Sequence, residues 1–175
     1  MAKRRYRRYR RSRGRWSSNI SRINMTGVAV PDEIFGDTYT IAQNPSQSNT
    51  TVSQQYTVKN VEITGQLEAG AAGNYSMIEN ITYYIMYVPE GYPISLDLPF
   101  AHPEWIMAYK FIGQAANAGS GDFSQPPRVK TRLSRRLNTG DSIIFLYTGI
   151  NSSTSSSNNT PVKFNGLVRW WTKAN

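Results

Sequence analysis

The sequence has no cysteine, a single histidine and no long apolar run. Without cysteine, disulfides and thiolate metal sites are excluded, so the fold must be held together by packing. That absence fits an intracellular assembly better than a small secreted scaffold. No apolar stretch approaches the roughly 20 residues that span a bilayer, so no membrane insertion is expected. A secretory signal is missing too, because polar residues 17–19 follow the basic start.

Patterns typical of catalysis are also lacking. His102 cannot supply a metal-binding cluster alone, and a Ser-His-Asp arrangement would have to use it. Gly65, Gly70 and Gly73 lack the spacing of a phosphate-binding loop. The scattered acidic residues form no evident catalytic pair. We therefore expect a protein that is not an enzyme and has no cofactor and no metal site.

Acidic residues are absent from the first 22 positions, although the whole chain has 20 Lys and Arg, 11 Asp and Glu, and a net charge of +9. Residues 23–175 are nearly neutral, so the excess charge lies in this arm. Like charges packed this densely repel, and no apolar face offsets the entropy of ordering. We expect a disordered arm over residues 1–22 and one folded domain over residues 23–175.

The arm repeats Arg-Arg-Tyr, and this composition favours nucleic-acid binding. Arginines that pair with phosphates release counterions, which makes binding strong and indifferent to sequence. Aromatic rings stack on unpaired bases, which favours single strands. The residues predicted to bind are Lys3, Arg4, Arg5, Tyr6, Arg7, Arg8, Tyr9, Arg10, Arg11, Arg13, Arg15 and Trp16. Two alternatives are a tail that serves only as a nuclear import signal and a mitochondrial transit peptide, which would need an apolar face.

The remaining chain is rich in Tyr, Thr, Val and Ile without sustained helical periodicity, which predicts an all-β domain. Eight strands are expected, at residues 24–30, 37–43, 56–68, 80–88, 107–113, 127–137, 142–149 and 162–173. Residues 81–88 and 143–147 are apolar on both faces, which indicates central strands, strands under a second layer or contacts with neighbouring subunits. Short strands with long connections predict a single jelly-roll β-sandwich.

A second basic feature lies in the predicted strand 127–137. Strand alternation places Arg128, Lys130, Arg132 and Arg136 on one side, and Val129, Thr131, Leu133 and Leu137 on the other. We predict that the basic row binds nucleic acid, and the alternative is a solvated face of an exposed strand. Arg169 and Lys173 would extend the row if they share its side. Turn residues 138–141 predict that 127–137 and 142–149 pair as a hairpin.

Residues 2–16 resemble the arginine-rich motif of capsid proteins from circovirus-like viruses, which have circular, replication-initiator-encoding single-stranded DNA genomes. Residues 92–113 and 128–147 are similar to segments of environmental members, and together these stretches cover about a third of the chain. The resemblance implies a jelly roll, a small icosahedral homo-oligomeric shell, packaging of viral single-stranded DNA, and nuclear entry through import receptors that bind the arm. The implied locations are the virion and, during assembly, the host nucleus. Because the chain is short for this family, no host receptor is carried over.

Other functions fit parts of this pattern. One alternative is a capsid protein of a small RNA virus with a similar build, because arginine-rich arms of this kind bind either DNA or RNA. A non-viral nucleic-acid-binding β-barrel protein, ribosomal or architectural, would usually place charge and stacking aromatics on its folded surface as well. A secreted jelly-roll ligand or lectin is disfavoured by the arm and by the missing secretory signal.

Overall fold

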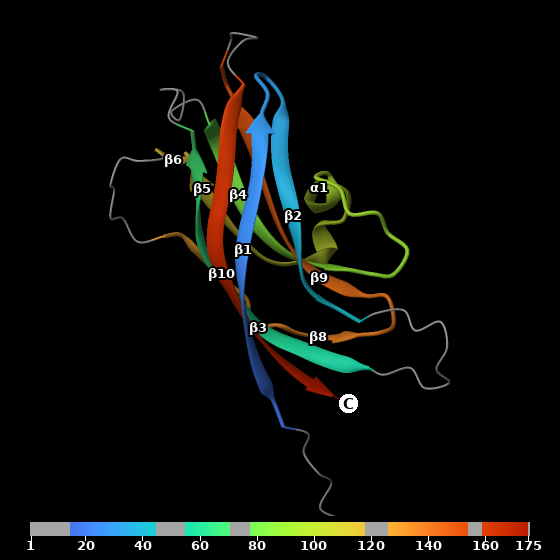
Figure 1. Cartoon of the computed structure of the whole chain (residues 1–175). Coiled ribbons are helices and arrows are strands. Elements are labelled where there is room, and N and C mark those ends of the chain that lie inside the picture. The colour runs from blue at the N-terminus through green and yellow to red at the C-terminus, as the bar shows by residue number, and fades with distance from the viewer. Residues whose placement is uncertain (1–14, 45–54, 71–77, 118–125, 154–158, 175) are drawn as a thin grey trace, which may run out of the picture.

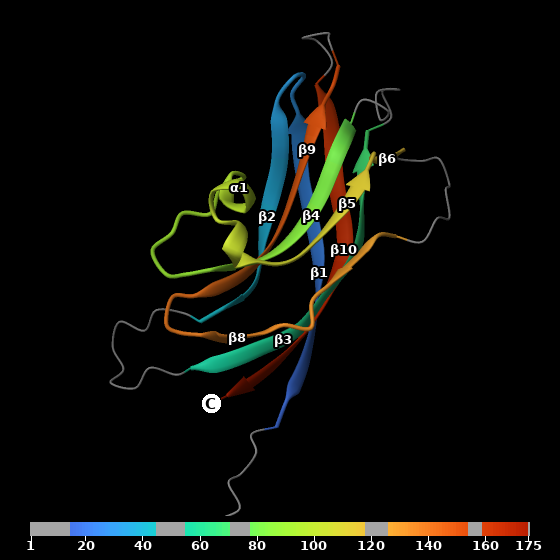
Figure 2. The ribbon, with the colours of Figure 1, turned by 180° about the vertical axis from the view of Figure 1, so that it is seen from behind.

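The strands of the domain form two sheets that pack face to face (Figures 1 and 2). The structure is a computed structural model, and it describes residues 15–44, 55–70, 78–117, 126–153 and 159–174. Predictions for residues 1–14 therefore lie outside the described residues.

The first sheet has the order β1 (Ser17–Ala29), β10 (Thr160–Ala174) and β3 (Tyr56–Ala69). β1 and β10 pair antiparallel along the whole of β1. Three short strands share the far edge of β3. These are β7 (Arg128–Lys130) and β8 (Ser134–Leu137), which are antiparallel to β3, and β6 (Ala116–Asn117), which is parallel to it.

The second sheet has the order β2 (Ile34–Gln43), β9 (Ser142–Asn151), β4 (Ile78–Val88) and β5 (Ile106–Gly113), all antiparallel. The connection between β4 and β5 contains the short helix α1 (Leu98–Ala101) and a 3-10 turn (Pro103–Trp105). Figure 1 shows this connection on the side of the second sheet that faces away from the first.

The chain passes repeatedly from one sheet to the other. β1 and β3 lie in the first sheet with β2 between them in the second; β4 and β5 follow in the second sheet, then β7 and β8 in the first, β9 in the second and β10 in the first. With β7 and β8 counted as one interrupted strand and the two-residue β6 left aside, this is the eight-strand order of a jelly roll. The predicted fold class is confirmed.

Aromatic residues fill the space between the sheets. The Tyr83 ring makes edge contacts with Phe145 and Phe164, with centroids 5.6 and 5.4 Å apart. All three rings are at most 1% exposed. The Tyr83 hydroxyl accepts a hydrogen bond of 3.0 Å from the Leu67 N–H, which links the second sheet to the first. Burial raises the pKa of Tyr83 far above its usual value of 10.0, so this hydroxyl stays neutral.

The α1 connection covers part of the outer face of the second sheet. Leu98 packs there in a separate apolar cluster with Met86 and Val88 of β4 and Ile144 and Leu146 of β9. β9 is therefore buried on both faces and β4 is buried on its outer face at Met86 and Val88, which agrees with the apolar sequences of residues 81–88 and 143–147. Their apolar outer sides meet a layer from the same chain.

The first strand is longer than expected, because β1 begins at Ser17 rather than at residue 24. Residues 17–22, which we assigned to the arm, pair with residues 167–172 of β10. β1 is an edge strand, and β10 supplies its main-chain partners regardless of side-chain polarity. The polar composition of residues 17–22 therefore concealed a strand.

The predicted hairpin of residues 127–137 with 142–149 is wrong. β8 pairs with β3 in the first sheet, whereas β9 pairs with β2 and β4 in the second. The turn itself forms, and buried Asp141 holds it. Its carboxylate accepts hydrogen bonds from Asn138 N–H at 2.8 Å, Tyr87 O–H at 2.8 Å and Glu90 N–H at 3.1 Å. The turn thus moves the chain between sheets.

Candidate nucleic-acid interface

The outer face of the first sheet carries most of the described positive charge. Its strands alternate, with Val58, Ile63, Phe164 and Val168 directed into the core and the neighbouring residues directed outward. The outward positions hold basic side chains on β1, β3, β7, β8 and β10. These residues, which we call the basic face, are Arg22, Lys59, Arg128, Lys130, Arg136, Lys163, Arg169 and Lys173.

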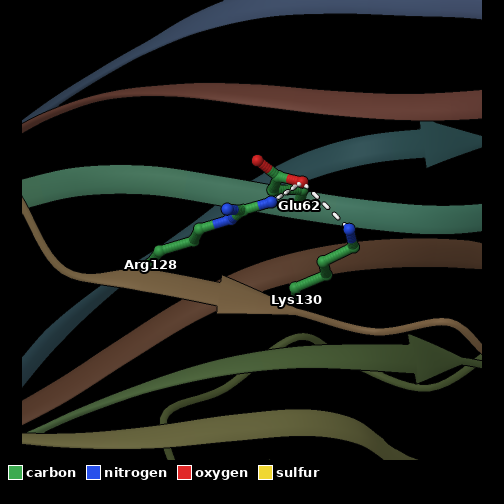
Figure 3. A network of polar contacts seen from close by, with 3 residues as sticks. All are labelled: Glu62, Arg128 and Lys130. Carbon is green, nitrogen blue, oxygen red and sulfur yellow. Dashed lines mark hydrogen bonds and ion pairs between the residues drawn. The ribbon is translucent and has the colours of Figure 1, made fainter.

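Glu62 lies within the basic face and organises two of its cations (Figure 3). Arg128 Nη2 lies 2.6 Å and Lys130 Nζ 3.5 Å from Glu62 Oε2. Partial burial by itself raises the pKa of Glu62, but the hydrogen bond and charge of Arg128, together with Lys130, outweigh this and lower the pKa below 4.5. Glu62 therefore stays charged and fixes the positions of both cations.

The structure does not form one continuous strand over residues 127–137. β7 ends at Lys130 and β8 begins at Ser134. Between them the Thr131 N–H donates to Val61 O at 2.9 Å, and the Leu133 N–H donates to Thr131 Oγ1 at 3.1 Å. The turn breaks the alternation, so Leu133 is 51% exposed instead of buried.

The predicted basic row is consequently divided. Arg128 and Lys130 project from β7 and Arg136 from β8 on the same outer face, whereas Arg132 is exposed in the break between them. Arg135 turns the other way, and its guanidinium lies 5.5 Å from the centre of the Tyr87 ring in the second sheet. The prediction that four basic residues form one row on a single strand is thus wrong, because the break separates Arg132 from the paired residues of β7 and β8.

The described end of the arm lies against the basic face. Arg15 is exposed, and the Trp16 ring lies under the Lys59 ammonium at 3.9 Å. The cation–π contact ties the start of β1 to β3 across the intervening strand β10. Lys3 to Arg13 lie outside the described residues.

Sequence reasoning missed three members of the basic face, because Arg22 was assigned only to the arm, without a predicted role, and Lys59 and Lys163 were assigned to no binding surface. Lys59 stands opposite Trp171, and Lys163 stands opposite Glu68, in the β3–β10 ladder. Strand alternation assigns each to an outward position. Sequence alone did not show that β10 lies between β1 and β3, and that order brings these residues together with Arg169 and Lys173.

Acidic residues lie mainly on the other side of the domain. On the outer face of the first sheet the described acids are Glu62 and Glu68. The second sheet and its connections hold Asp32, Glu33, Asp37, Glu79, Glu90, Asp97, Glu104 and Asp141, and there the one described base is Lys110. The basic side chains therefore gather on the outer face of the first sheet, whereas six of the described acids lie in the connections that lead into and between the strands of the second sheet.

No group of three or more His, Cys, Asp or Glu residues able to hold a metal ion occurs within residues 15–44, 55–70, 78–117, 126–153 and 159–174. In those ranges no helix has the length and hydropathy required to cross a bilayer.

Comparison with known proteins gives weak similarities. No protein-family model and no curated protein matches the sequence. The chain is similar to a capsid chain of cyanophage Pam1 at 12% identity and a TM-score of 0.38, covering 90% of this chain and 85% of that one. It is also similar to a chain of turnip yellow mosaic virus at 12% identity and a TM-score of 0.37, covering 91% and 94%. A third similar structure is VP1 of trichodysplasia spinulosa-associated polyomavirus, at 9% identity and a TM-score of 0.27. The match covers 89% of this chain and 97% of that one. Scores this low carry no argument about function, so the fold assignment stands on the strand order.

Proposed function

We propose that this protein is a viral capsid protein that self-assembles into a small icosahedral shell and packages circular single-stranded DNA through its arginine-rich arm. The observation that carries the proposal is the polarity of the jelly roll. Its basic face adjoins Arg15 and Trp16, whereas most of the described acids lie in the connections around the second sheet. A shell around a polyanion requires a basic inner surface and a differently charged outer one.

The arm and the basic face act together in this proposal. Residues 1–16 supply densely spaced arginines that neutralise phosphates without reading sequence. Tyr6, Tyr9 and Trp16 add stacking on unpaired bases. The basic face supplies a fixed surface, and the Trp16–Lys59 contact joins it to the described end of the arm. No catalytic chemistry is required, and we assign the protein a structural role with no cofactor.

Particle formation tests the shell. The full chain is expressed, purified at low salt and examined by electron microscopy, and uniform closed particles are expected. A stable monomer under conditions where the chain is folded would contradict the capsid proposal. It would favour a non-viral nucleic-acid-binding β-barrel protein instead.

The choice of polymer needs a competition experiment, because heterologous expression loads host RNA. Dissociated subunits are reassembled with equal amounts of circular single-stranded DNA and single-stranded RNA of the same length. Packaged polymer is then identified by digestion with DNase or RNase. Preferential packaging of DNA is expected, and preferential packaging of RNA would favour an RNA virus capsid.

Nuclear import through the arm is a second part of the proposal. Residues 1–16 fused to a fluorescent protein are expected to accumulate in the nuclei of cultured cells. The matched control replaces the arm's basic residues by Gln and keeps its length and aromatic residues. Equal distribution of both fusions between nucleus and cytoplasm would refute recognition by import receptors.

A further inference from the structure

A hollow of about 560 Å³ lies on the outer face of the first sheet, where β1, β10 and β3 run side by side. Side chains that line it are Arg22, Asn24, Thr64, Gln66, Asn165 and Leu167. This volume lies within the range of about 300–1,000 Å³ that small-molecule sites occupy. The hollow is therefore large enough for a nucleotide.

Main chain forms the floor of the hollow. Gly65 and Gly166 face each other in the β3–β10 ladder, and the Phe164 ring lies beneath both. A Cβ added to Gly65 or Gly166 would meet Phe164 ring atoms at 2.5 or 2.8 Å. The close packing under the floor makes it a rigid base for the side chains around it.

Three amide side chains form one row across the hollow. Asn24 of β1 stands opposite Asn165 of β10, and Asn165 stands opposite Gln66 of β3. Strands are about 4.8 Å apart, so the row extends over roughly 9.6 Å. Within the described residues none of these amides makes a side-chain hydrogen bond to the protein. Each offers two N–H donors and a carbonyl acceptor to a ligand.

A second row lies two residues further along the strands, at a distance of about 6.7 Å. It contains Arg22 of β1, Leu167 of β10, Thr64 of β3 and Arg128 of β7. Arg22 has no acidic partner among the described residues, whereas Arg128 uses one nitrogen for Glu62. Leu167 is 47% exposed between them and offers an apolar surface. The cationic side chains of this second row thus lie beside the amide row, and the apolar Leu167 side chain lies between Arg22 and Arg128.

We propose that this hollow binds one unpaired nucleotide of the packaged strand, with the base on the amide row and the phosphate on Arg22. Asn and Gln amides match the adjacent donors and acceptors of base edges, and a guanidinium matches phosphate. The base must be unpaired, because a base in a duplex is stacked and its edges do not reach the floor of a hollow. This inference rests on the proposed function and adds a binding site on the folded domain.

Binding to matched oligonucleotides tests the site. Full-length subunits, kept too dilute to assemble, are titrated with a fluorescent single-stranded DNA and with an abasic strand of the same length. We expect the triple variant N24A/Q66A/N165A to lose about tenfold in affinity for the DNA and less than twofold for the abasic strand. The arm is identical in the unaltered protein and the triple variant, so its stacking on bases is the same in both. A change in the preference for DNA over the abasic strand therefore reports on the hollow.

Two controls separate this site from general charge and surface effects. Thr26→Ala changes an exposed β1 position outside the hollow, and it should leave both affinities unchanged. Arg22→Gln should weaken binding to both oligonucleotides. It should also lower the slope of log affinity against log salt concentration by about 0.7, because one phosphate contact is lost. Lys110→Gln removes the same charge from the second sheet and should not change the slope.

Photo-crosslinking gives an independent readout. Particles assembled around DNA that contains 5-iododeoxyuridine are irradiated, and crosslinked peptides are identified by mass spectrometry. Crosslinks to residues 22–24, 64–66 or 165–167 are expected. Crosslinks confined to the arm, or a hollow covered by a second protein subunit, would overturn the site.

The outcomes also distinguish this inference from the proposed function. If the unaltered protein binds neither strand, the proposed function and the site both fail. If it binds DNA and the triple variant keeps the full difference between DNA and the abasic strand, the site alone fails.

Discussion

Glu62→Gln tests whether the basic face contacts nucleic acid. Glu62 is 19% exposed and engages Arg128 and Lys130 by one oxygen. Gln keeps the shape of the side chain but removes its charge, so both cations become available to phosphates. One additional phosphate contact steepens the dependence of log affinity on log salt by about 0.7 for a single strand, and two contacts double that value.

The cost in stability should be small. The Arg128 side chain is 53% exposed and the Lys130 side chain 41%, so solvent screens both pairs. We expect Glu62→Gln to lower the free energy of unfolding by no more than about 1 kcal/mol. Urea unfolding of the full chain measures this quantity and shows that the variant is folded before binding is compared.

The binding assay is fluorescence anisotropy of a labelled single-stranded DNA over a series of salt concentrations. Glu104→Gln is the matched control, because it removes the same charge from an exposed side chain between β4 and β5, beside His102. A steeper slope for Glu62→Gln alone is expected. Equal slopes for both variants and the unaltered protein would refute a role for the basic face.

The pH dependence of the Glu62 contacts has a defined sign. Arg128 and Lys130 lower the pKa of Glu62 below 4.5, so the pairs stabilise the folded state fully above that value. Their contribution is lost as the pH falls through the lowered pKa. The difference in unfolding free energy between the unaltered protein and Glu62→Gln should therefore be constant at neutral pH and disappear in acid.

Three substitutions test the fold. Asp141→Ala removes a buried acceptor of three hydrogen bonds and should lower the free energy of unfolding by about 3 kcal/mol in urea unfolding, whereas exposed Asp97→Ala should change it little. Gly166→Ala places a Cβ 2.8 Å from the Phe164 ring and should cost about 1–3 kcal/mol in the same assay. Leu98→Ala opens the cluster under α1 and should cost about 2–5 kcal/mol. Wild-type stability in any of these variants would contradict the packing described.

Alternation of residue types predicted the strands because the two sheets need apolar inner faces. The eight expected segments correspond to observed strands, and both twice-apolar runs occupy central positions in the second sheet. The ends of the strands were harder to predict from the sequence. Ser17–Arg22 forms a strand because β10 offers it main-chain partners, and that partner lies far away in sequence.

The candidate site was predicted only in part, because it depends on which strands are neighbours. Arg128, Lys130 and Arg136 share a face as expected, but Arg132 lies in the break between β7 and β8, where the Leu133 N–H donates to Thr131 Oγ1. The amide row depends on the register of three strands, and no local pattern in the sequence contains that register.

The structure also connects the arm to one side of the domain. Ser18 stands opposite Trp171 on the outward side of the first sheet, and Trp16 continues along β1 to the Lys59 ammonium. Arg15, the residue before Trp16, is exposed, so the described end of the arm lies at the basic face. In the proposed shell, an orientation with the second sheet inside would place the acids of its connections beside the packaged phosphates and Arg15 and Trp16 away from them. Electrostatic repulsion disfavours that orientation, so the first sheet is the one we assign to the interior.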